Sequence, residues 1–344
     1  MISDSNMSKF NNNERDNVYL IAEIGSNHNQ DKNLALEMID MAAQTGANAV
    51  KFQSLRFDKI YQSEYETEEF RKFFSQIELD ENWYLDLAKQ AKKSGVDFIS
   101  CPTYIESIDL LEECNVPLYK IASPQTYANL DIVKRVAQTG KPLIMSLGYC
   151  EYNDISKAIK VIEDEGNKQI TLLHCISKYP MNVVDANLRF IQTLQKMTGY
   201  NVGFSDHSLN DHLSIAAVAL GARVIEKHVT IDRNMSGPDH NFAMTFDEFS
   251  KMETRIRDIS LGLGDGIRST LLKDEYNNRK NFDLKVFSKV NIKKGEQIEE
   301  SMLFFKRLSR DGILKSDSNF LCNFKAKRNI DSENIMTWND VDFI

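Results

Sequence analysis

Two histidines, His207 and His228, stand 21 positions apart in similar local settings. His207 follows the apolar run 200–204, and His228 follows the apolar run 222–225. The segment 213–221 between them has the small and apolar residues of a helix that packs on a sheet. If the two runs are neighbouring parallel strands, both imidazoles lie at one edge and can ligate a divalent metal ion. Two unrelated histidines at strand ends explain this spacing equally well.

Polar residues also follow the other apolar runs, at the positions where strands would end. They are Glu23, Lys51, Gln53, Ser100, Lys120, Ser123, Ser146, Ser177, Tyr179, Ser205 and Glu226. Lysines and serines that meet at one edge would suit a phosphate or carboxylate, because lysine supplies charge and hydroxyls add hydrogen bonds. Glu23 and Glu226 are candidates for proton transfer if burial raises a carboxyl pKa. Ion pairs of these glutamates with Lys51 or Lys227 are the competing interpretation.

These residues are positioned by eight apolar runs that alternate with segments of helical length. The runs are 19–24, 49–52, 96–99, 118–122, 142–145, 170–173, 201–204 and 223–225. Glycine precedes four of them, as expected where a helix ends before a strand; these are Gly46, Gly95, Gly140 and Gly221. Eight such units predict an α/β protein with a (β/α)8 TIM barrel, whose active site lies at the C-terminal ends of its strands. An open doubly wound sheet is the alternative, but no glycine-rich phosphate loop follows the first run.

The chain changes character on either side of the barrel, which is expected over 17–263. Residues 264–284 are polar and charged and are predicted to form a linker. Residues 285–344 are predicted to form a small β-rich domain. Residues 1–16 are polar and asparagine-rich, which predicts a flexible tail rather than a signal peptide.

The composition excludes several classes of protein. The net charge of −8 comes from interspersed acidic and basic residues, so there is no basic surface for nucleic acid. Five cysteines without regular spacing predict reduced thiols and a cytoplasmic protein. No apolar run approaches the roughly 18 residues that a membrane span needs. We therefore expect no nucleic-acid or membrane partner.

Several motifs follow one another in order along the predicted barrel. They are 22–29 (AEIGSNHN), 50–53 (VKFQ), 119–123 (YKIAS), 174–175 (HC) with 179–180 (YP), 205–207 (SDH), 226–228 (EKH) and 237–240 (GPDH). In order and spacing they resemble the sialic acid (N-acetylneuraminate/nonulosonate) synthase family. The segment 285–344 resembles the C-terminal antifreeze-like (SAF) domain of that family.

The resemblance implies an enzyme that condenses phosphoenolpyruvate with an N-acetylated hexosamine, by default N-acetylmannosamine. The products would be a nine-carbon 2-keto acid and phosphate, released by C–O cleavage. His207 and His228 would ligate a divalent ion, Mn²⁺ by default with Mg²⁺ or Co²⁺ as alternatives. Glu23 would handle the proton of the water or the aldehyde. Phosphoenolpyruvate would be held by Lys51, Lys120, Ser123, Ser146 and Ser205, and the sugar and its surroundings by Gln53, Gln125, Ser177, Tyr179, Glu226 and Asp239.

The resemblance also implies a domain-swapped homodimer, because in the family the SAF domain of one subunit covers the barrel of its partner. Arg307 would then reach the N-acetyl end of the sugar in the partner's site. The residues 308–312 depart from the family pattern, so Arg310 is an alternative for this role.

Departures at sugar-facing positions leave the acceptor open. Gln125 stands where many members have an acidic residue, and Ser177 stands where N-acetylneuraminate-forming members often have asparagine. A diacetamido-trideoxyhexose, leading to legionaminate or pseudaminate, is therefore an alternative acceptor. Two further alternatives are a non-catalytic sugar-binding protein on the same fold and a barrel synthase that uses a phosphosugar. The intact lysine, serine and histidine set argues against the first, and the SAF-like segment argues against the second.

Overall fold

The structure is a computed structural model that describes residues 18–344 apart from 63, 65 and 269. It divides into two compact units, the first ending at Asp265 and the second running from Gly266 to Ile344. The tail predicted over 1–16 lies outside the described residues. Within the described ranges, no helix combines the length and the apolar character that crossing a bilayer requires.

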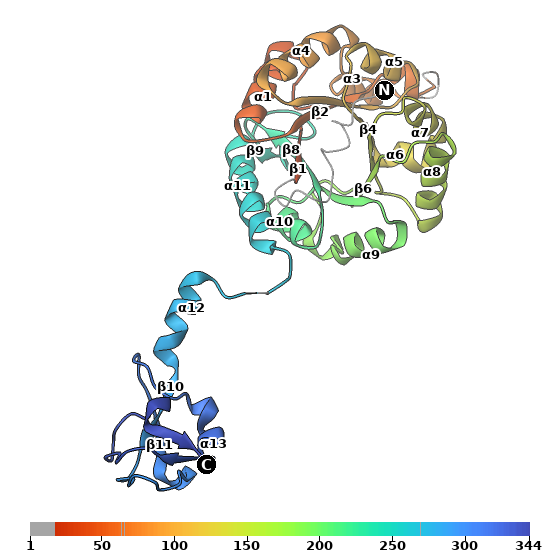
Figure 1. Cartoon of the computed structure of the whole chain (residues 1–344). Coiled ribbons are helices and arrows are strands. Elements are labelled where there is room, and N and C mark those ends of the chain that lie inside the picture. Colours follow the sequence, from red (N-terminus) through yellow and green to blue (C-terminus); the bar gives the residue numbers. More distant parts are fainter. Residues whose placement is uncertain (1–17, 63, 65, 269) are drawn as a thin grey trace. The chain divides into compact units, whose positions relative to one another are not determined.

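Eight parallel strands form a barrel in the first unit, in the order β3-β2-β1-β8-β7-β6-β5-β4. They are β1 (Tyr19–Glu23), β2 (Ala49–Ser54), β3 (Asp97–Pro102), β4 (Tyr119–Ile121), β5 (Leu143–Ser146), β6 (Ile170–Cys175), β7 (Asn201–Asp206) and β8 (Val224–Thr230). A short strand, β9 (Met244–Thr245), pairs with β8. β4 also packs against β3, so the strands form a nearly closed ring inside a ring of helices (Figure 1). The predicted TIM barrel is confirmed.

The helices alternate with the strands and cover the outside of the barrel. They are α1 (Lys32–Gln44), α2 (Phe57–Ile60), α3 (Glu68–Ser75), α4 (Tyr84–Ser94), α5 (Glu106–Glu113), α6 (Ser123–Ala128), α7 (Leu130–Ala137), α8 (Tyr152–Asp164), α9 (Arg189–Thr198), α10 (His212–Ala219) and α11 (Phe246–Leu263). Local sequence sets their ends. The side chain of Asp31 caps α1 by accepting hydrogen bonds from two backbone amides of its first turn. The four glycines predicted to lie between helices and strands all adopt positive φ angles.

Alternation along the strands produces two apolar layers. The layer inside the barrel consists of Tyr19, Ile21, Ala49, Ile99, Leu118, Ile144, Leu173 and Val224. The larger layer lies between the strands and the helices and takes the neighbouring residues, such as Leu20 and Val50. Because side chains two positions apart share a face, residues that follow the inner layer at spacing two also point toward the barrel axis. Polar residues at those positions therefore converge at one end of the barrel.

Two outward-pointing residues of β7 and β8 form a buried ion pair behind the barrel wall. The Lys227 Nζ lies 3.1 Å from the Asp206 Oδ2, and the two side chains are 2% and 0% exposed. Ser214 of α10 donates a hydrogen bond to Asp206 at 2.6 Å. Lys227 donates to the carbonyl of Asn210 at 3.0 Å. The pair thus fixes the loop after β7 to the outer side of β8.

The second unit contains two small antiparallel sheets around its own core. β10 (Leu284–Ser288) pairs with β11 (Leu303–Arg307), and β12 (Phe324–Ala326) pairs with β13 (Val341–Phe343). α13 (Ser318–Leu321) precedes β12. The core comprises Val286, Ile292, Ile298, Leu303, Ile313, Leu321, Ala326, Ile330, Met336 and Val341. A small β-rich domain after the barrel is confirmed as predicted.

One helix lies within the segment that the sequence suggested would be a linker. α12 (Lys273–Arg279) begins where the Glu275 side chain accepts a hydrogen bond from the backbone amide of Leu272 at 3.2 Å. Its residues are polar, and none of its side chains is buried. The apolar periodicity used to find helices is therefore missing, although capping favours this one.

We expect Asp206→Ala to lower the free energy of unfolding by about 3–5 kcal/mol, because it leaves the buried Lys227 ammonium without a counter-charge. Urea denaturation followed by circular dichroism measures this loss. Asp109→Ala is the matched control, since it removes the exposed partner of Arg135, 2.9 Å away. The control should lose less than about 1 kcal/mol. Equal losses in the two variants would contradict a special contribution of the buried pair.

Candidate active site

A cavity of about 400 Å³ opens at the C-terminal ends of the barrel strands. Most of the site residues predicted from the sequence line it. These are Glu23, Lys51, Gln53, Lys120, Ser123, Gln125, Ser146, Ser177, Tyr179, Ser205, His207, Glu226 and His228. Each of the eight strands, or the loop that follows it, contributes to the lining. Residues from distant parts of the sequence are therefore brought together as the barrel requires.

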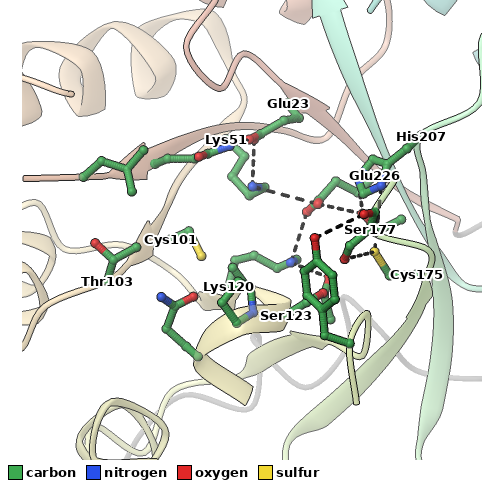
Figure 2. A pocket seen from close by; sticks show the side chains of 18 of the residues that line it. Glu23, Lys51, Cys101, Thr103, Lys120, Ser123, Cys175, Ser177, His207 and Glu226 are labelled. Carbon is green, nitrogen blue, oxygen red and sulfur yellow. Dashed lines mark hydrogen bonds and ion pairs between the residues drawn. The ribbon is translucent and has the colours of Figure 1, made fainter. Parts of the chain in front are cut away.

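The centre of the cavity is a row of alternating charges. The Lys51 Nζ lies 2.8 Å from the Glu23 Oε2 and 3.9 Å from the Glu226 Oε1. The Glu226 Oε2 lies 3.6 Å from the Lys120 Nζ. Figure 2 shows the Lys51 ammonium between the two carboxylates. The alternative pairing with Lys227 is wrong, because Lys227 lies on the outward face of β8 and pairs with Asp206.

The surroundings push the pKa values of the two glutamates apart. Burial raises the pKa of Glu23, and the negative charge of Glu226 adds to this rise, against the opposing effects of Lys51 and Gln53. Burial also acts to raise the pKa of Glu226, but the charges of Lys120 and Lys51 outweigh it and lower that pKa to about 2. Glu226 is therefore the permanent counter-ion of the lysines. Glu23 is the carboxyl whose pKa is raised, which makes it the better candidate for proton transfer.

Lys120 and several serine hydroxyls line the same cavity. Lys120 donates a hydrogen bond to the Ser146 hydroxyl at 2.6 Å, and the backbone amide of Gly148 donates to the Ser123 hydroxyl at 3.0 Å. A Cβ atom at Gly148 would lie only 2.2 Å from the Ser177 Oγ and 2.8 Å from the Ser123 Oγ. The absence of a side chain at this position therefore lets the hydroxyls gather. An ammonium and several hydroxyls in one cavity suit a phosphate or carboxylate group.

The two histidines lie together at the ends of β7 and β8, with ring centroids 5.6 Å apart. The His207 Nδ1 lies 2.8 Å from the carbonyl of Ile176. Since a carbonyl only accepts, His207 donates through Nδ1, which leaves the lone pair on its Nε2, 3.5 Å from the Ser205 Oγ. The His228 Nδ1 accepts and donates no hydrogen bond among the described residues, and the nearest carboxylate oxygen, Asp239 Oδ2, lies 4.0 Å away. The pair can supply two nitrogen ligands to a metal ion.

Other protein groups do not complete this pair into a larger ligand set. Within residues 18–344, leaving out the three undescribed positions, no group of three or more His, Cys, Asp and Glu side chains is arranged to hold a metal ion. The ring of Tyr179 packs on His207 with centroids 4.1 Å apart and lies 5.9 Å from His228. An ion held by the two imidazoles would need water and substrate oxygens to complete its coordination.

Of the substrate-binding residues implied by the resemblance, Asp239 and Arg307 do not line the cavity. Asp239 belongs to the loop between β8 and β9, where its carboxylate accepts a hydrogen bond from the Ser26 hydroxyl at 2.8 Å. Arg307 belongs to the second unit, at the end of β11, with its guanidinium 5.2 Å from the ring centre of Phe282. The alternative residue Arg310 belongs to the same unit.

Two cysteines line the cavity although the sequence did not suggest them. Cys101 and Cys175 follow Ile99 and Leu173 of the inner layer at spacing two. Ser100, which was predicted at the strand end, instead points outward and lies 2.8 Å from the Ser54 hydroxyl. Counting positions from the inner apolar residue would have selected Cys101 over Ser100. All five cysteines of the chain are free thiols.

One wall of the cavity is apolar and was not predicted from the sequence. It is formed by Leu55, Ile60, Tyr61 and Phe74, which line the cavity from the segment between β2 and α4. Phe57 and Phe70 pack behind it, with the Tyr61 ring 5.6 Å from Phe57 and 5.1 Å from Phe70 between centroids. This insertion has no strand-end signal, so its part in the site could not be read from strand positions.

Comparisons with known proteins agree with this geometry. A model of the NeuB family matches residues 38–268. The N,N'-diacetyllegionaminic acid synthase of Campylobacter jejuni is 38% identical over 301 residues, which cover 84% of this chain and 90% of that protein. The pseudaminic acid synthase of Helicobacter pylori is 32% identical over 293 residues, with coverages of 82% and 86%.

A solved structure shows the same likeness. The N-acetylneuraminic acid (sialic acid) synthetase of Leptospira borgpetersenii is 34% identical, with a TM-score of 0.70, over 76% of this chain and 90% of that one. The family model covers the elements that supply the lysines, serines and histidines of the cavity. The chain therefore belongs to the NeuB family of nonulosonic acid synthases.

Proposed function

We propose that this protein condenses phosphoenolpyruvate with an N-acetylated amino sugar, forming a nine-carbon 2-keto acid and inorganic phosphate. The observation that carries the proposal is the meeting of two buried lysines, a group of serine hydroxyls and two imidazoles in one cavity of about 400 Å³. Phosphate and carboxylate groups suit the first two features, and a sugar aldehyde oxygen suits the third. The names of the relatives support the same reaction type.

In the proposed reaction, C3 of phosphoenolpyruvate forms a bond with the aldehyde carbon of the open-chain sugar. Water adds to C2, and the C2–O bond to phosphate breaks, which leaves the 2-keto group and free phosphate. Lys51 and Lys120 hold the phosphate and carboxylate of phosphoenolpyruvate as point charges. The hydroxyls of Ser123, Ser146 and Ser205 fix their orientation.

Glu23 is the proposed proton carrier. Its carboxyl lies at the end of β1, 2.8 Å from the amide of Gln53, and its pKa is raised by burial. A protonated Glu23 can give its proton to the oxygen that was the aldehyde, and the resulting carboxylate can take one from the attacking water. Glu226 stays ionised throughout, because the neighbouring lysines hold its pKa at about 2.

His207 and His228 are the proposed ligands of a divalent cation, with Mn²⁺ as our choice and Mg²⁺ or Co²⁺ as alternatives. The fixed tautomer of His207 and the unpartnered ring nitrogen of His228 suit such an ion. When bound, the cation supplies Lewis-acid polarisation of an aldehyde oxygen.

The acceptor is proposed to be N-acetylmannosamine or a diacetamido-trideoxyhexose. The apolar wall of Leu55, Ile60, Tyr61 and Phe74 favours the second sugar. A deoxy position has no hydroxyl group that would lose its hydrogen bonds to water on burial against this wall. The likeness to the legionaminic acid synthase of C. jejuni also favours it. Replacing the C6 hydroxymethyl group by methyl at such a wall is expected to raise kcat/KM by up to roughly 100-fold.

We also propose that the second unit is an SAF-like domain that covers the barrel of a second copy in a homodimer. The charges support this, since residues 266–344 carry net +3, while the preceding residues carry net −11. Tyr149, Tyr179 and Val184 near the mouth are 64%, 51% and 91% exposed, as expected for a surface that another chain covers. Arg307, or Arg310, would be supplied in this way to the partner's site.

The reaction is tested by measuring phosphate release from phosphoenolpyruvate with Mn²⁺ and a panel of acceptors, and product mass by mass spectrometry. The panel pairs N-acetylmannosamine with its 6-deoxy analogue and includes a 2,4-diacetamido-2,4,6-trideoxyhexose. We expect phosphate release that depends on the acceptor, with a higher kcat/KM for the deoxy sugars. No release with any amino sugar would favour a non-catalytic protein. Release only with arabinose 5-phosphate or erythrose 4-phosphate would favour a phosphosugar synthase.

His207→Ala is expected to abolish Mn²⁺-dependent turnover, lowering kcat/KM by more than about 100-fold, because one of two imidazole ligands is lost. Calorimetry should show a parallel loss of Mn²⁺ affinity, and circular dichroism should show an unchanged fold. His212→Ala is the matched control, since this exposed histidine at the start of α10 lies outside the cavity. Full Mn²⁺ affinity in His207→Ala would remove the two-histidine site.

Complementation tests the swapped dimer. Arg307→Ala and Glu23→Ala are each expected to be inactive, but a mixture that exchanges subunits should regain about a quarter of wild-type activity. In half of the dimers, one of the two sites then combines an intact barrel with an intact second unit. Tagged subunits and native mass spectrometry measure the exchange. No recovery after complete exchange would contradict a trans-acting Arg307, and the pair Arg310→Ala with Glu23→Ala then tests Arg310.

A further inference from the structure

We propose that His240 is a positioning residue that clamps two loops together and thereby fixes the Asp239 carboxylate beside the active site. The ligand that Asp239 meets rests on the proposed function, whereas the clamp itself rests on contacts within the chain. His240 follows Asp239 in the loop between β8 and β9. It does not line the cavity, so it acts through its neighbour and not on a reacting group.

The imidazole of His240 is fully buried, with 0% exposure, and both of its nitrogens are engaged. The Nδ1 lies 2.7 Å from the hydroxyl of Thr230, the last residue of β8. The Nε2 lies 3.1 Å from the side-chain oxygen of Asn29, in the loop between β1 and α1. One ring thus bridges two loops that are 211 positions apart in the sequence.

The backbone around the ring leaves it little freedom. A Cβ atom at Gly237 would lie 2.7 Å from the His240 Cδ2 and 2.9 Å from the Asn29 Oδ1. Gly237 has a φ of 150°, so two constraints favour glycine there. Asn29 has a φ of 50°, a left-handed conformation that asparagine tolerates better than most residues. The loop backbone therefore packs directly against the clamp.

Asp239 is held between this clamp and a second contact. Its carboxylate accepts a hydrogen bond from the Ser26 hydroxyl at 2.8 Å, and the same oxygen lies 4.0 Å from the His228 Nδ1. Ser26 and Asn29 belong to one loop, so both attachments fasten the Asp239–His240 pair to the same support. Buried polar groups almost always have hydrogen-bond partners, and what distinguishes this ring is that its partners, Thr230 and Asn29, lie far apart in the sequence. Two partners on two loops are what a clamp requires.

Three variants separate a positioning role from a purely structural one. His240→Asn keeps a polar group near Thr230 but loses the reach to Asn29. Asn29→Gly removes the other half of that contact while keeping the left-handed backbone. His174→Asn is the control, because His174 is also buried and bonds through Nε2 to the Ala186 carbonyl at 2.7 Å, on the outside of the barrel.

The first readout is amide hydrogen exchange of 24–31 and 231–243 in the protein without substrates. We expect faster exchange in both segments for His240→Asn and for Asn29→Gly, and no change there for His174→Asn. The second readout is steady-state kinetics. We expect the KM for the acceptor sugar to rise about tenfold in the first two variants, with kcat and the KM for phosphoenolpyruvate within about twofold of wild type. The double variant should be no worse than either single one.

Unchanged exchange in both segments would overturn the clamp, whatever the substrate is. Faster exchange with an unchanged acceptor KM, or an equal rise in the KM for phosphoenolpyruvate, would overturn the positioning of Asp239. If the wild-type protein turns over none of the acceptors, the proposed function is overturned. The hydrogen-exchange data would still test the clamp in that case.

Discussion

Two buried ammonium groups need negative charge within a few ångströms, because burying an unpaired charge costs several kcal/mol. In this barrel Lys51 and Lys120 are matched by Glu23 and Glu226, so the ionised row is neutral as a whole. Under the proposed function, phosphoenolpyruvate then brings negative charge into a neutral cavity. A proton on Glu23 and a divalent cation at the imidazoles would together offset the roughly −3 charge of its carboxylate and phosphate. The raised pKa of Glu23 fits this need.

The same alternation of side chains that creates the charged row also creates its support. Inward residues of β7 and β8 face the cavity, while their outward neighbours Asp206 and Lys227 form the buried pair behind the wall. On each of these two strands, three consecutive residues therefore supply side chains both to the cavity and to the ion pair behind the wall. The site is held by strands on one side and by loops on the other, where Ser26 and Asp239 meet.

Much of the fold followed from local sequence, and much of the site followed from the fold. Apolar runs gave the eight strands, and glycines gave several of the turns between helices and strands. Strand ends then identified most of the lining residues. The errors came where position within the strand was not counted, as for Ser100 and Cys101, and where the pairing of Glu226 depended on which face Lys227 occupies.

Other features lie beyond what sequence patterns can predict. The apolar wall comes from an insertion whose side chains reach the cavity only through tertiary packing of Phe57 and Phe70. The contact of His240 with Asn29 joins loops at opposite ends of the barrel sequence, and no local periodicity encodes it. The role proposed for Arg307 would depend on a second chain, so neither its type nor its spacing could establish it.

The uneven charge of the chain has a kinetic consequence. An anion that approaches a barrel segment carrying net −11 meets repulsion at distances comparable with the Debye length, about 8 Å at physiological ionic strength. The lysines attract an anion only inside the cavity, because the neighbouring glutamates cancel the lysine charges at longer distances. Under the proposed function, the far field would therefore not steer phosphoenolpyruvate inward, and added salt would speed the encounter instead of slowing it. In the proposed dimer, the net positive second unit of the partner would lie near the mouth and would turn this repulsion into attraction. Pairing of the subunits would then raise the rate of substrate capture as well as supply the arginine to the site.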